Sequence, residues 1–326
     1  MPRCIGSPRD SCSRSSARAI GLVLSVLCLD CGGPSNIVTG PTDVSGGPSE
    51  ASNPSAALST LVSRVLAPPQ VFVGAGDIAL CERGAEAEAT ARLLDGIDGT
   101  VFALGDNVYQ SGTAQEFHDC YDPTWGRHKN RTRPVPGNHE YESSGAAPYF
   151  SYFGLNAGPP GRGYYSFEVG NWHAIALNSN ISAGADSPQG AWLRADLAAN
   201  RTRCAIAYWH HPLFSSGTHG DQPQMREVWR LLHEAGADIV LSGHDHTYER
   251  FAPQDADGFP DAAHGIRQFV VGTGGAAPYA FTSVRPTSEV RISTLGVLKL
   301  TLRADDYDWS FIPVSGPGDS GSGACH

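Results

Sequence analysis

Short apolar runs alternate with helical patterns from Val71 onward. Each run is apolar at nearly every position and is bounded by Gly or Asn, which is typical of strands buried on both faces. Such strands, joined by helices, indicate an α/β fold whose loops meet at the carboxyl ends of the strands. The predicted strands are Val71–Gly76, Thr100–Gly105, Trp172–Asn178, Ala205–His210, Asp238–Gly243 and Phe269–Gly275.

Two helices and a hairpin complete the predicted domain. The segment Ser187–Asn200 has a proline at its first helical position and a stripe of tryptophan and leucine. The segment Pro223–Ala235 places its large apolar residues at i, i+3, i+4 and i+7, which is typical of a helix that faces a core. After Gly296 the alternation of apolar and polar residues predicts an antiparallel hairpin that turns at Ala304–Asp306.

The N-terminal part of the chain has a different amino-acid composition. Four arginines precede the apolar run Ile20–Leu29, and small residues follow it, so residues 1–31 are predicted to be a signal peptide. The run is too short to cross a bilayer, which needs about 20 residues. Cys31 is a candidate lipid anchor, so the exported protein is periplasmic, extracellular or a membrane-anchored lipoprotein. Residues 32–66, rich in Gly, Pro and Ser, are predicted to be a flexible linker to a domain at 67–326.

Composition narrows the possible functions. Hydrophobic residues make up 40% of the chain and charged residues 17%, which fits a globular protein with a sizeable core. The formal net charge of −10 argues against nucleic-acid binding, which needs a basic surface. An anionic substrate would therefore have to be attracted locally, by fixed cations or metal ions.

Cysteine usage agrees with export. Four cysteines lie outside the leader, and four cysteines allow three pairings. We favour Cys81–Cys120, which flanks two candidate site loops, and Cys204–Cys325, which would tie the C-terminal tail to the start of a strand.

Side chains of the metal-ligand type follow five strand ends, namely those of four predicted strands and that of the segment RPVP (133–136). One aspartate after a strand is commonly a turn residue, but five such positions at one edge of a sheet predict a shared metal site. Mixed imidazole, carboxylate and amide groups suit zinc, iron or manganese better than calcium. The residues are Asp77, then Asp106 and Tyr109, then Asn138 and His139, then His210 and His211, and finally His244 and His246.

The motifs around these residues resemble those of the calcineurin-like metallophosphoesterase superfamily, and within it the purple acid phosphatase-like branch. The matching segments are GDNVY (105–109), GNHE (137–140) and GHDH (243–246), together with Asp77 and His210, and they span about residues 70–250. The resemblance implies a four-layer αββα sandwich of two mixed β-sheets flanked by helices. It also implies two metal ions, which would be Fe, Zn or Mn.

The same resemblance implies a role for each ligand. Asp106 would bridge both ions, and Asp77 and His246 would bind the first. Many members carry a histidine where this chain has Ala79, whereas purple acid phosphatases use a tyrosine three residues after the bridging aspartate. Tyr109 has that spacing, so it is predicted to be a ligand of the first ion, where a phenolate favours Fe(III), rather than a core tyrosine. The predicted ligands of the second ion are Asn138, His210 and His244.

Two further histidines are implied to act on the substrate without binding metal. His139 would stabilise the phosphoryl group or protonate the leaving oxygen, and His219 would face the substrate. Glu140 and Asp245 are expected to orient neighbouring imidazoles. For His211, the sequence is equally consistent with a role in supporting the site and with a simple contact within its loop.

The predicted function is that of an exported dinuclear-metal hydrolase of phosphoric esters. The two ions would generate hydroxide at neutral pH for in-line attack on a small phosphorylated substrate, most simply a monoester. A phosphodiesterase or nucleotide hydrolase is the nearest alternative, and the pocket around Asn107, Arg127 and His219 would separate the two. A non-catalytic, metal-dependent surface-binding protein is the third alternative. The sequence makes no prediction of oligomeric state.

Overall fold

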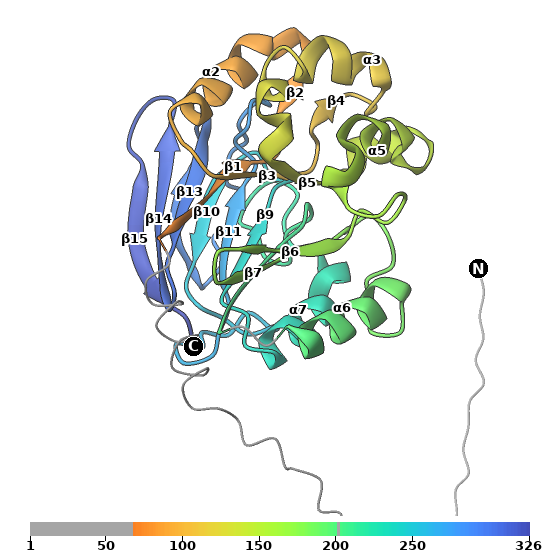
Figure 1. The fold of residues 1–326 in the computed structure, drawn as a ribbon. Helices are drawn as coiled ribbons and strands as arrows, with labels where there is room; N and C mark the ends of the chain where they lie inside the picture. Colours follow the sequence, from red (N-terminus) through yellow and green to blue (C-terminus); the bar gives the residue numbers. More distant parts are fainter. Residues whose placement is uncertain (1–67, 201–202) are drawn as a thin grey trace, which may run out of the picture. The chain divides into compact units, whose positions relative to one another are not determined.

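The computed structural model describes residues 68–200 and 203–326 (Figure 1). The predicted signal peptide at 1–31, the candidate anchor Cys31 and the linker at 32–66 lie outside the described residues. No helix among the described residues is both long enough and apolar enough to span a membrane.

Two mixed β-sheets form the centre of the domain. Strands β1, β3 and β5 of the first sheet are parallel, and β13 joins β1 in the antiparallel sense. In spatial order the strands of this sheet are β15 (Asp319–Ala324), β14 (Asp306–Pro313), β13 (Gly296–Leu302), β1 (Gln70–Ala75), β3 (Thr100–Leu104) and β5 (Thr132–Val135).

The second sheet has a parallel centre and antiparallel edges. Strands β7, β8, β9 and β11 are parallel, while β6 and β10 pair in the antiparallel sense with their neighbours. In spatial order this sheet contains β12 (Ser288–Ile292), β10 (Tyr248–Phe251), β11 (Arg267–Val271), β9 (Ile239–Ser242), β8 (Cys204–Tyr208), β7 (Trp172–Ala176) and β6 (Tyr165–Val169). A short parallel pair, β2 (Ala79–Leu80) and β4 (Val108–Tyr109), lies apart from both sheets.

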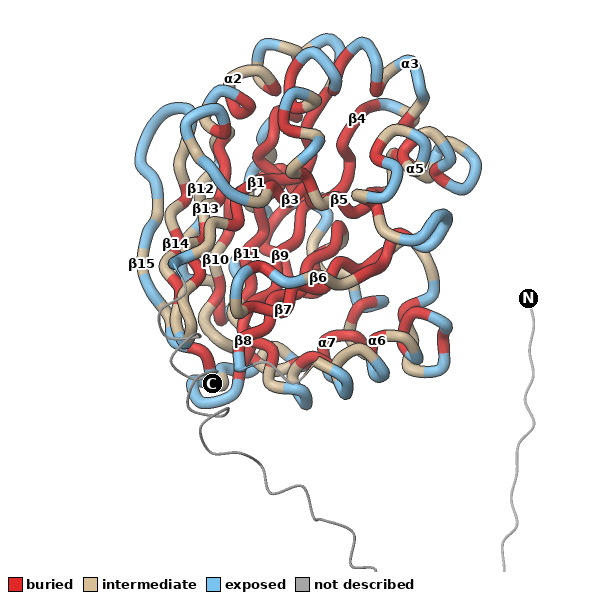
Figure 2. The backbone as a smooth tube through the Cα atoms, viewed as in Figure 1, coloured by how far each residue is buried: buried red, intermediate tan, exposed pale blue. Residues whose placement is uncertain are grey.

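Helices cover both outer faces of the sheet pair. In Figure 1 the helices above the sheets are α2 (Gly84–Asp95), α3 (Ala114–Glu116) and α5 (Ala147–Phe153), and those below are α6 (Pro188–Ala199) and α7 (Arg226–Glu234). The buried segments in Figure 2 follow the strands, while the outer turns of the helices are exposed. The predicted four-layer αββα sandwich is confirmed.

Side-chain alternation along β8 shows why the second sheet is covered on both faces. Ile206 and Tyr208 belong to the large core that also contains the first sheet. Ala205 and Ala207 point the other way, into a second core with Leu193 of α6 and neighbouring residues of α7. Because successive side chains of a strand point to opposite faces, a strand between two cores has to be apolar throughout.

The structure confirms the six predicted strands, each within a few residues, and both predicted helices. The second helix begins as a 3-10 turn at Pro223–Met225 before α7. The hairpin is confirmed as β13 and β14. Both favoured disulfides, Cys81–Cys120 and Cys204–Cys325, are present.

Candidate metal centre

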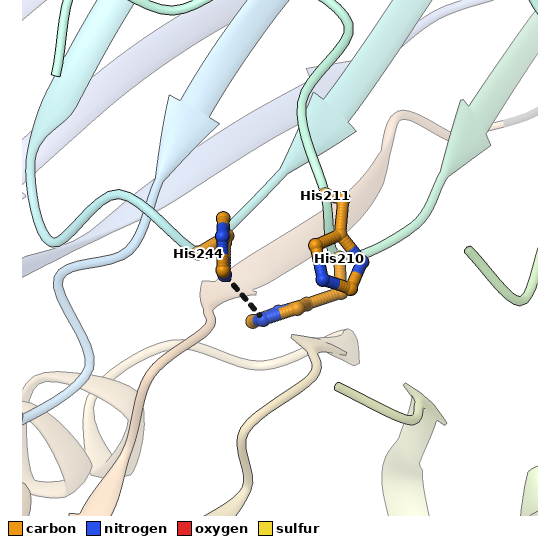
Figure 3. A group of neighbouring side chains, drawn as sticks. All are labelled: His210, His211 and His244. Atoms are coloured by element: carbon orange, nitrogen blue, oxygen red, sulfur yellow. Dashed lines mark hydrogen bonds between the residues drawn. The ribbon is translucent and has the colours of Figure 1, made fainter. Parts of the chain in front are cut away.

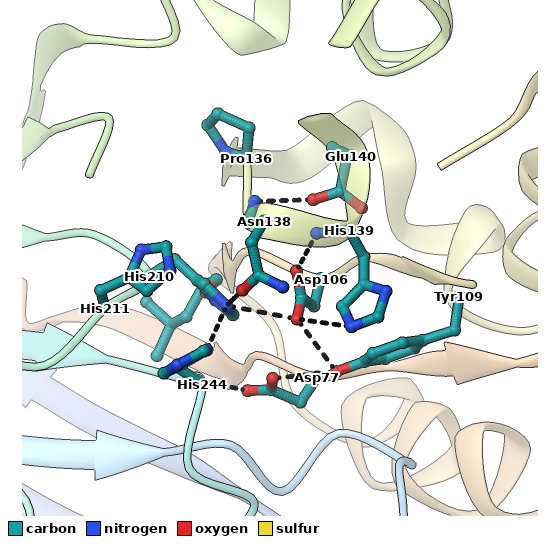
Figure 4. A network of polar contacts seen from close by, with 12 residues as sticks. Asp77, Asp106, Tyr109, Pro136, Asn138, His139, Glu140, His210, His211 and His244 are labelled. Atoms are coloured by element: carbon teal, nitrogen blue, oxygen red, sulfur yellow. Dashed lines mark hydrogen bonds and ion pairs between the residues drawn. The ribbon is translucent and has the colours of Figure 1, made fainter. Parts of the chain in front are cut away.

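The predicted ligands lie on loops that leave the carboxyl ends of β1, β3, β5, β8 and β9. Asp77 follows β1, Asp106 follows β3, and Asn138 opens the short helix α4 (Asn138–Glu142) after β5. His210 follows β8 and His244 follows β9. Figure 4 shows these side chains converging between the two sheets, as expected where the ends of parallel strands meet.

Three of these residues adopt a left-handed backbone conformation. The φ angle is 60° at Asp77, 46° at Asp106 and 71° at His244. Positive φ is uncommon for residues other than glycine and concentrates at functional sites, where surrounding contacts hold the chain. The sharp turn lets each strand end aim its next side chain at the centre.

Each aspartate uses one oxygen to hold a loop and presents the other to the site. Asp77 Oδ2 accepts the backbone N–H of His244 at 2.9 Å, and Asp106 Oδ1 accepts that of His139 at 2.9 Å. Gly137 permits this approach, since a Cβ there would collide with Asp106 Oδ1. The free oxygens, Asp77 Oδ1 and Asp106 Oδ2, face the other ligands.

The first group of ligand atoms surrounds the hydroxyl of Tyr109. That oxygen lies 3.0 Å from Asp77 Oδ1, 3.3 Å from Asp106 Oδ2 and 3.1 Å from His246 Nε2. His246 Nδ1 lies 2.8 Å from the carbonyl of Ala277, to which it donates, so Nε2 carries a lone pair in the neutral ring. One phenolic proton cannot satisfy three acceptors, and a cation among these atoms would.

The second group surrounds His210 Nε2. His210 Nδ1 donates to the carbonyl of Leu104 at 2.8 Å, which leaves Nε2 as an acceptor in the neutral ring. Around it lie Asn138 Oδ1 at 3.1 Å, Asp106 Oδ2 at 3.2 Å and His244 Nδ1 at 3.2 Å. Figure 3 shows the rings of His210 and His244 approaching each other through these nitrogens.

Asp106 Oδ2 belongs to both groups. It lies 3.3 Å from the hydroxyl oxygen of Tyr109 and 3.2 Å from His210 Nε2, which is the position a bridging carboxylate needs. Ligand bonds of about 2.1 Å at right angles would place neighbouring ligand atoms about 3 Å apart, close to the separations seen here. The donor set therefore fits two cations.

The titration of the buried groups reflects both their burial and the charges of neighbouring ligands. Burial opposes charge on His210, but Asp106 raises the pKa of that imidazole to about 9. Burial, followed by the charges of Asp77 and Asp106, raises the pKa of Tyr109 well above its ordinary value. Burial and the neighbouring His210 lower the pKa of His244, which keeps its ring neutral and leaves one nitrogen as a lone-pair donor.

The two predicted substrate-facing histidines lie beside these ligands. His139 Nε2 is 3.9 Å from Asp106 Oδ2, and its Nδ1 lies within hydrogen-bond distance of the carbonyl of Gln110. His219 is exposed, and its ring centroid lies 4.3 Å from that of His244. The structure thus brings together all nine residues predicted for the site.

Two carboxylates act differently from the sequence-based expectation. Glu140 and Asp245 were expected to orient imidazoles, but Glu140 accepts mainly backbone N–H groups, and Asp245 accepts one backbone N–H and the hydroxyl of Ser215. Glu140 accepts from Asn107 and Gly137, at 2.8 and 2.7 Å, and so ties two ligand loops together. Asp245 accepts the backbone N–H of His219 at 2.8 Å and fixes its loop. The sequence shows that both carboxylates are present, but it does not show which hydrogen-bond donors they bind.

Two residues that were expected to shape the substrate pocket make their contacts elsewhere in the protein. Asn107 is fully buried, and its side chain donates to the carbonyl of Val135. Arg127 forms ion pairs with Glu88 and Asp95 of α2. The pocket expectation was wrong for these two positions, because Asn107 is buried and Arg127 pairs with α2.

Sequence reasoning missed Tyr279 and left the setting of His211 open. The ring of Tyr279 stacks on His246 with centroids 4.0 Å apart and planes at 14°. It comes from a loop without a recognisable motif. His211 Nδ1 lies 2.8 Å from Ser179 Oγ, and its ring centroid is 4.5 Å from that of His244, so it lines the second group.

Comparison with known proteins identifies the class. The calcineurin-like phosphoesterase family model matches residues 54–248, more than half of the chain. The chain therefore belongs to the calcineurin-like phosphoesterase family. Curated proteins that the chain is similar to include plant purple acid phosphatases. Purple acid phosphatase 21 of Arabidopsis thaliana is 32% identical over 206 residues, covering 57% of this chain and 46% of the relative. Purple acid phosphatase 15 of the same plant is 34% identical over 200 residues, covering 50% and 38%.

Solved structures agree on the fold. The purple acid phosphatase PPD1 from yellow lupin seeds aligns with a TM-score of 0.65 and 19% identity, over 78% of this chain and 54% of that one. GAP50, described as the anchor in the inner membrane complex of Plasmodium, aligns with a TM-score of 0.62 and 14% identity, over 80% and 90%. The chain spans less than half the length of the two curated plant relatives.

Proposed function

We propose that the protein is an exported phosphomonoesterase that works with two metal ions. The observation that carries the proposal is the pair of acceptor-rich groups joined at Asp106 Oδ2, because neither group has enough protons to satisfy its own atoms. Two cations would also supply the local positive charge that a chain with a net charge of −10 needs to bind a phosphate ester.

The geometry supports a division of the ligands between two positions. The first would be held by Asp77, Tyr109 and His246, whose inward atoms lie 3.0 to 3.4 Å apart. The second would be held by Asn138, His210 and His244. Asp106 would serve both. A phenolate ligand favours Fe(III) in the first position, with Zn, Mn or Fe in the second.

Bound cations of this kind lower the pKa of a water and neutralise phosphoryl oxygens. The chain itself has to orient the ester and supply a proton. His139 is placed for that work, because its Nε2 points toward the shared carboxylate while Gln110 holds its Nδ1. His219 lies at the exposed edge, where it can contact the leaving group or a phosphoryl oxygen.

Export is supported by the two disulfides, since such bonds persist mainly in oxidising compartments. Periplasmic, extracellular and lipid-anchored locations stay open, and so does the attachment of lipid at Cys31.

Monoester and diester substrates can be separated by direct assay. Purified protein should hydrolyse p-nitrophenyl phosphate faster than bis-p-nitrophenyl phosphate, and metal analysis should find about two ions per chain. The variant Asp106→Asn should lose metal and turnover together, while circular dichroism shows an intact fold. Preferential diester hydrolysis would replace the monoesterase assignment with that of a phosphodiesterase. Two bound ions without turnover on either ester would favour the metal-dependent binding protein.

A further inference from the structure

Tyr279 contacts His246 through both its ring and its backbone. The two rings are stacked at 4.0 Å, and the backbone N–H of Tyr279 donates to the carbonyl of His246 at 3.0 Å. Two residues earlier, the carbonyl of Ala277 accepts a hydrogen bond from His246 Nδ1 at 2.8 Å. The segment 277–279 therefore contacts the imidazole of His246 at its face and at Nδ1, and it also binds the backbone carbonyl of His246.

This segment is itself anchored on both sides. Ser293 Oγ donates to the carbonyl of Tyr279 at 2.6 Å. Thr282 donates its backbone N–H to Ser216 and its hydroxyl to Gly217, at 3.1 and 2.9 Å. Tyr279 is thus fixed between the loop that carries His246 and the loop that leads to His219.

The stack determines where His246 points. A hydrogen bond at Nδ1 leaves the imidazole free to tilt about that contact, and such a tilt would move Nε2 away from Tyr109 and Asp77, which lie at 3.1 and 3.4 Å. A flat ring packed at 4.0 Å blocks the tilt. Contacts that orient a metal-ligating imidazole commonly contribute 10- to 100-fold to metal affinity.

We infer that Tyr279 is a positioning residue of the first metal position and acts through the face of its ring on His246. The inference rests on the proposed metal binding and adds a residue that belongs to none of the sequence motifs. It assigns the effect to the aromatic face rather than to the hydroxyl, so phenylalanine should replace tyrosine without loss.

The test compares Tyr279→Ala with Tyr279→Phe in the metal-loaded protein. Competition against a chromophoric chelator should show one of the two ions bound roughly 10-fold more weakly in Tyr279→Ala, and within about twofold of wild type in Tyr279→Phe. With iron bound, the visible band expected from Tyr109 should shift in the alanine variant alone. Phe259→Ala removes an exposed aromatic ring, 67% accessible, and serves as the matched control.

Three results would overturn the inference. Unchanged affinities and spectrum in Tyr279→Ala would show that the stack has no role. An equal loss in Tyr279→Phe would assign the effect to the hydroxyl. A matching drop in both ions, together with a lowered melting temperature, would show only a general loss of packing. If the wild-type protein bound no metal, the proposed function itself would fail. Metal binding by the wild-type protein is therefore measured before any variant is made.

Discussion

The backbone N–H of His244 donates a hydrogen bond to Asp77 Oδ2 at 2.9 Å, although 167 positions separate the two residues along the chain. This bond joins the loop after β1 to the loop after β9, and thus connects the two sheets at the candidate metal centre. Both residues have positive φ angles, so the contact also holds two unfavourable backbone conformations in place.

Replacing Asp77 by Asn should separate its structural role from its role as a ligand. The amide oxygen can still accept the N–H of His244, so the melting temperature should change by only a few degrees. The lost negative charge should reduce kcat/KM by on the order of 10²- to 10³-fold, corresponding to several kcal/mol of transition-state stabilisation. Steady-state kinetics and metal analysis measure the effect. Asp186→Asn, an exposed carboxylate, is the control, and equal losses in both variants would contradict the assignment.

Tyr109→Phe should remove the visible absorption band of the protein and leave its fold intact. If iron occupies the first position, phenolate-to-iron charge transfer gives a visible band, and the phenylalanine variant should lose it. The core should tolerate the change, because the ring is buried and only the hydroxyl is removed. Visible absorption and iron content are measured on the same sample. A wild-type protein that is colourless with stoichiometric iron would refute the tyrosine ligand.

The two disulfides should differ in their effect on stability. They span 39 and 121 residues, and loop-closure entropy predicts upper limits of about 4 and 5 kcal/mol for them. The double variant Cys204→Ser with Cys325→Ser should therefore lose about 1 kcal/mol more than Cys81→Ser with Cys120→Ser. Denaturant unfolding gives both values, and the reverse order would contradict the entropic account. Thiol titration of the denatured, processed protein should find at most one free thiol.

His173 should make stability depend on pH away from the metal centre. Its ring contacts Glu168 and Asp196 at 2.8 and 2.7 Å; burial opposes its charge, but the two carboxylates raise its pKa above 6.5. The pKa of Asp196 is lowered from 3.8, because His173 and Ser166 outweigh its burial. The histidine contribution is therefore complete below its unfolded pKa and is lost as the pH rises through the folded value. The aspartate contribution is complete above its unfolded pKa and is lost as the pH falls through its folded value.

The stability difference between wild type and His173→Gln should thus be largest between about pH 4 and pH 6.5, where both groups are charged. Hydrogen bonds to charged groups suggest roughly 2 kcal/mol there. Urea unfolding at several pH values measures it. His118→Gln, in an exposed pair with Asp119, is the control and should show little effect. A difference that grows above pH 8 would contradict the prediction.

The buried parallel strands were predictable because burial on both faces leaves a continuous apolar signal. Strand β15 was not predicted, because its sequence DSGSGA has no large apolar residue. Its glycines make room for aromatic rings of the neighbouring strand: a Cβ at Gly321 would collide with Trp309. Helix α2 was also missed, since its core contacts come from Ala87, Ala91 and Leu94, which form a weak stripe.

The candidate site was predictable wherever a motif follows a strand. Tyr279 was not, because its position depends on a loop conformation set by hydrogen bonds to distant segments. The partners of Glu140, Asp245 and Arg127 were missed for a related reason. A sequence shows that a charge is present, but only the packed chain shows which backbone groups or ions it meets.

The left-handed turns at Asp77, Asp106 and His244 have a consequence for engineering. Glycine at such a position would relax the backbone by about 1 kcal/mol or more. Variants selected only for heat resistance would therefore be expected to change His244, whose backbone N–H could still donate to Asp77, rather than the two aspartates, whose side chains hold neighbouring loops. Such variants would gain thermal stability and lose catalytic activity at the same time. A screen for stability therefore has to measure activity as well.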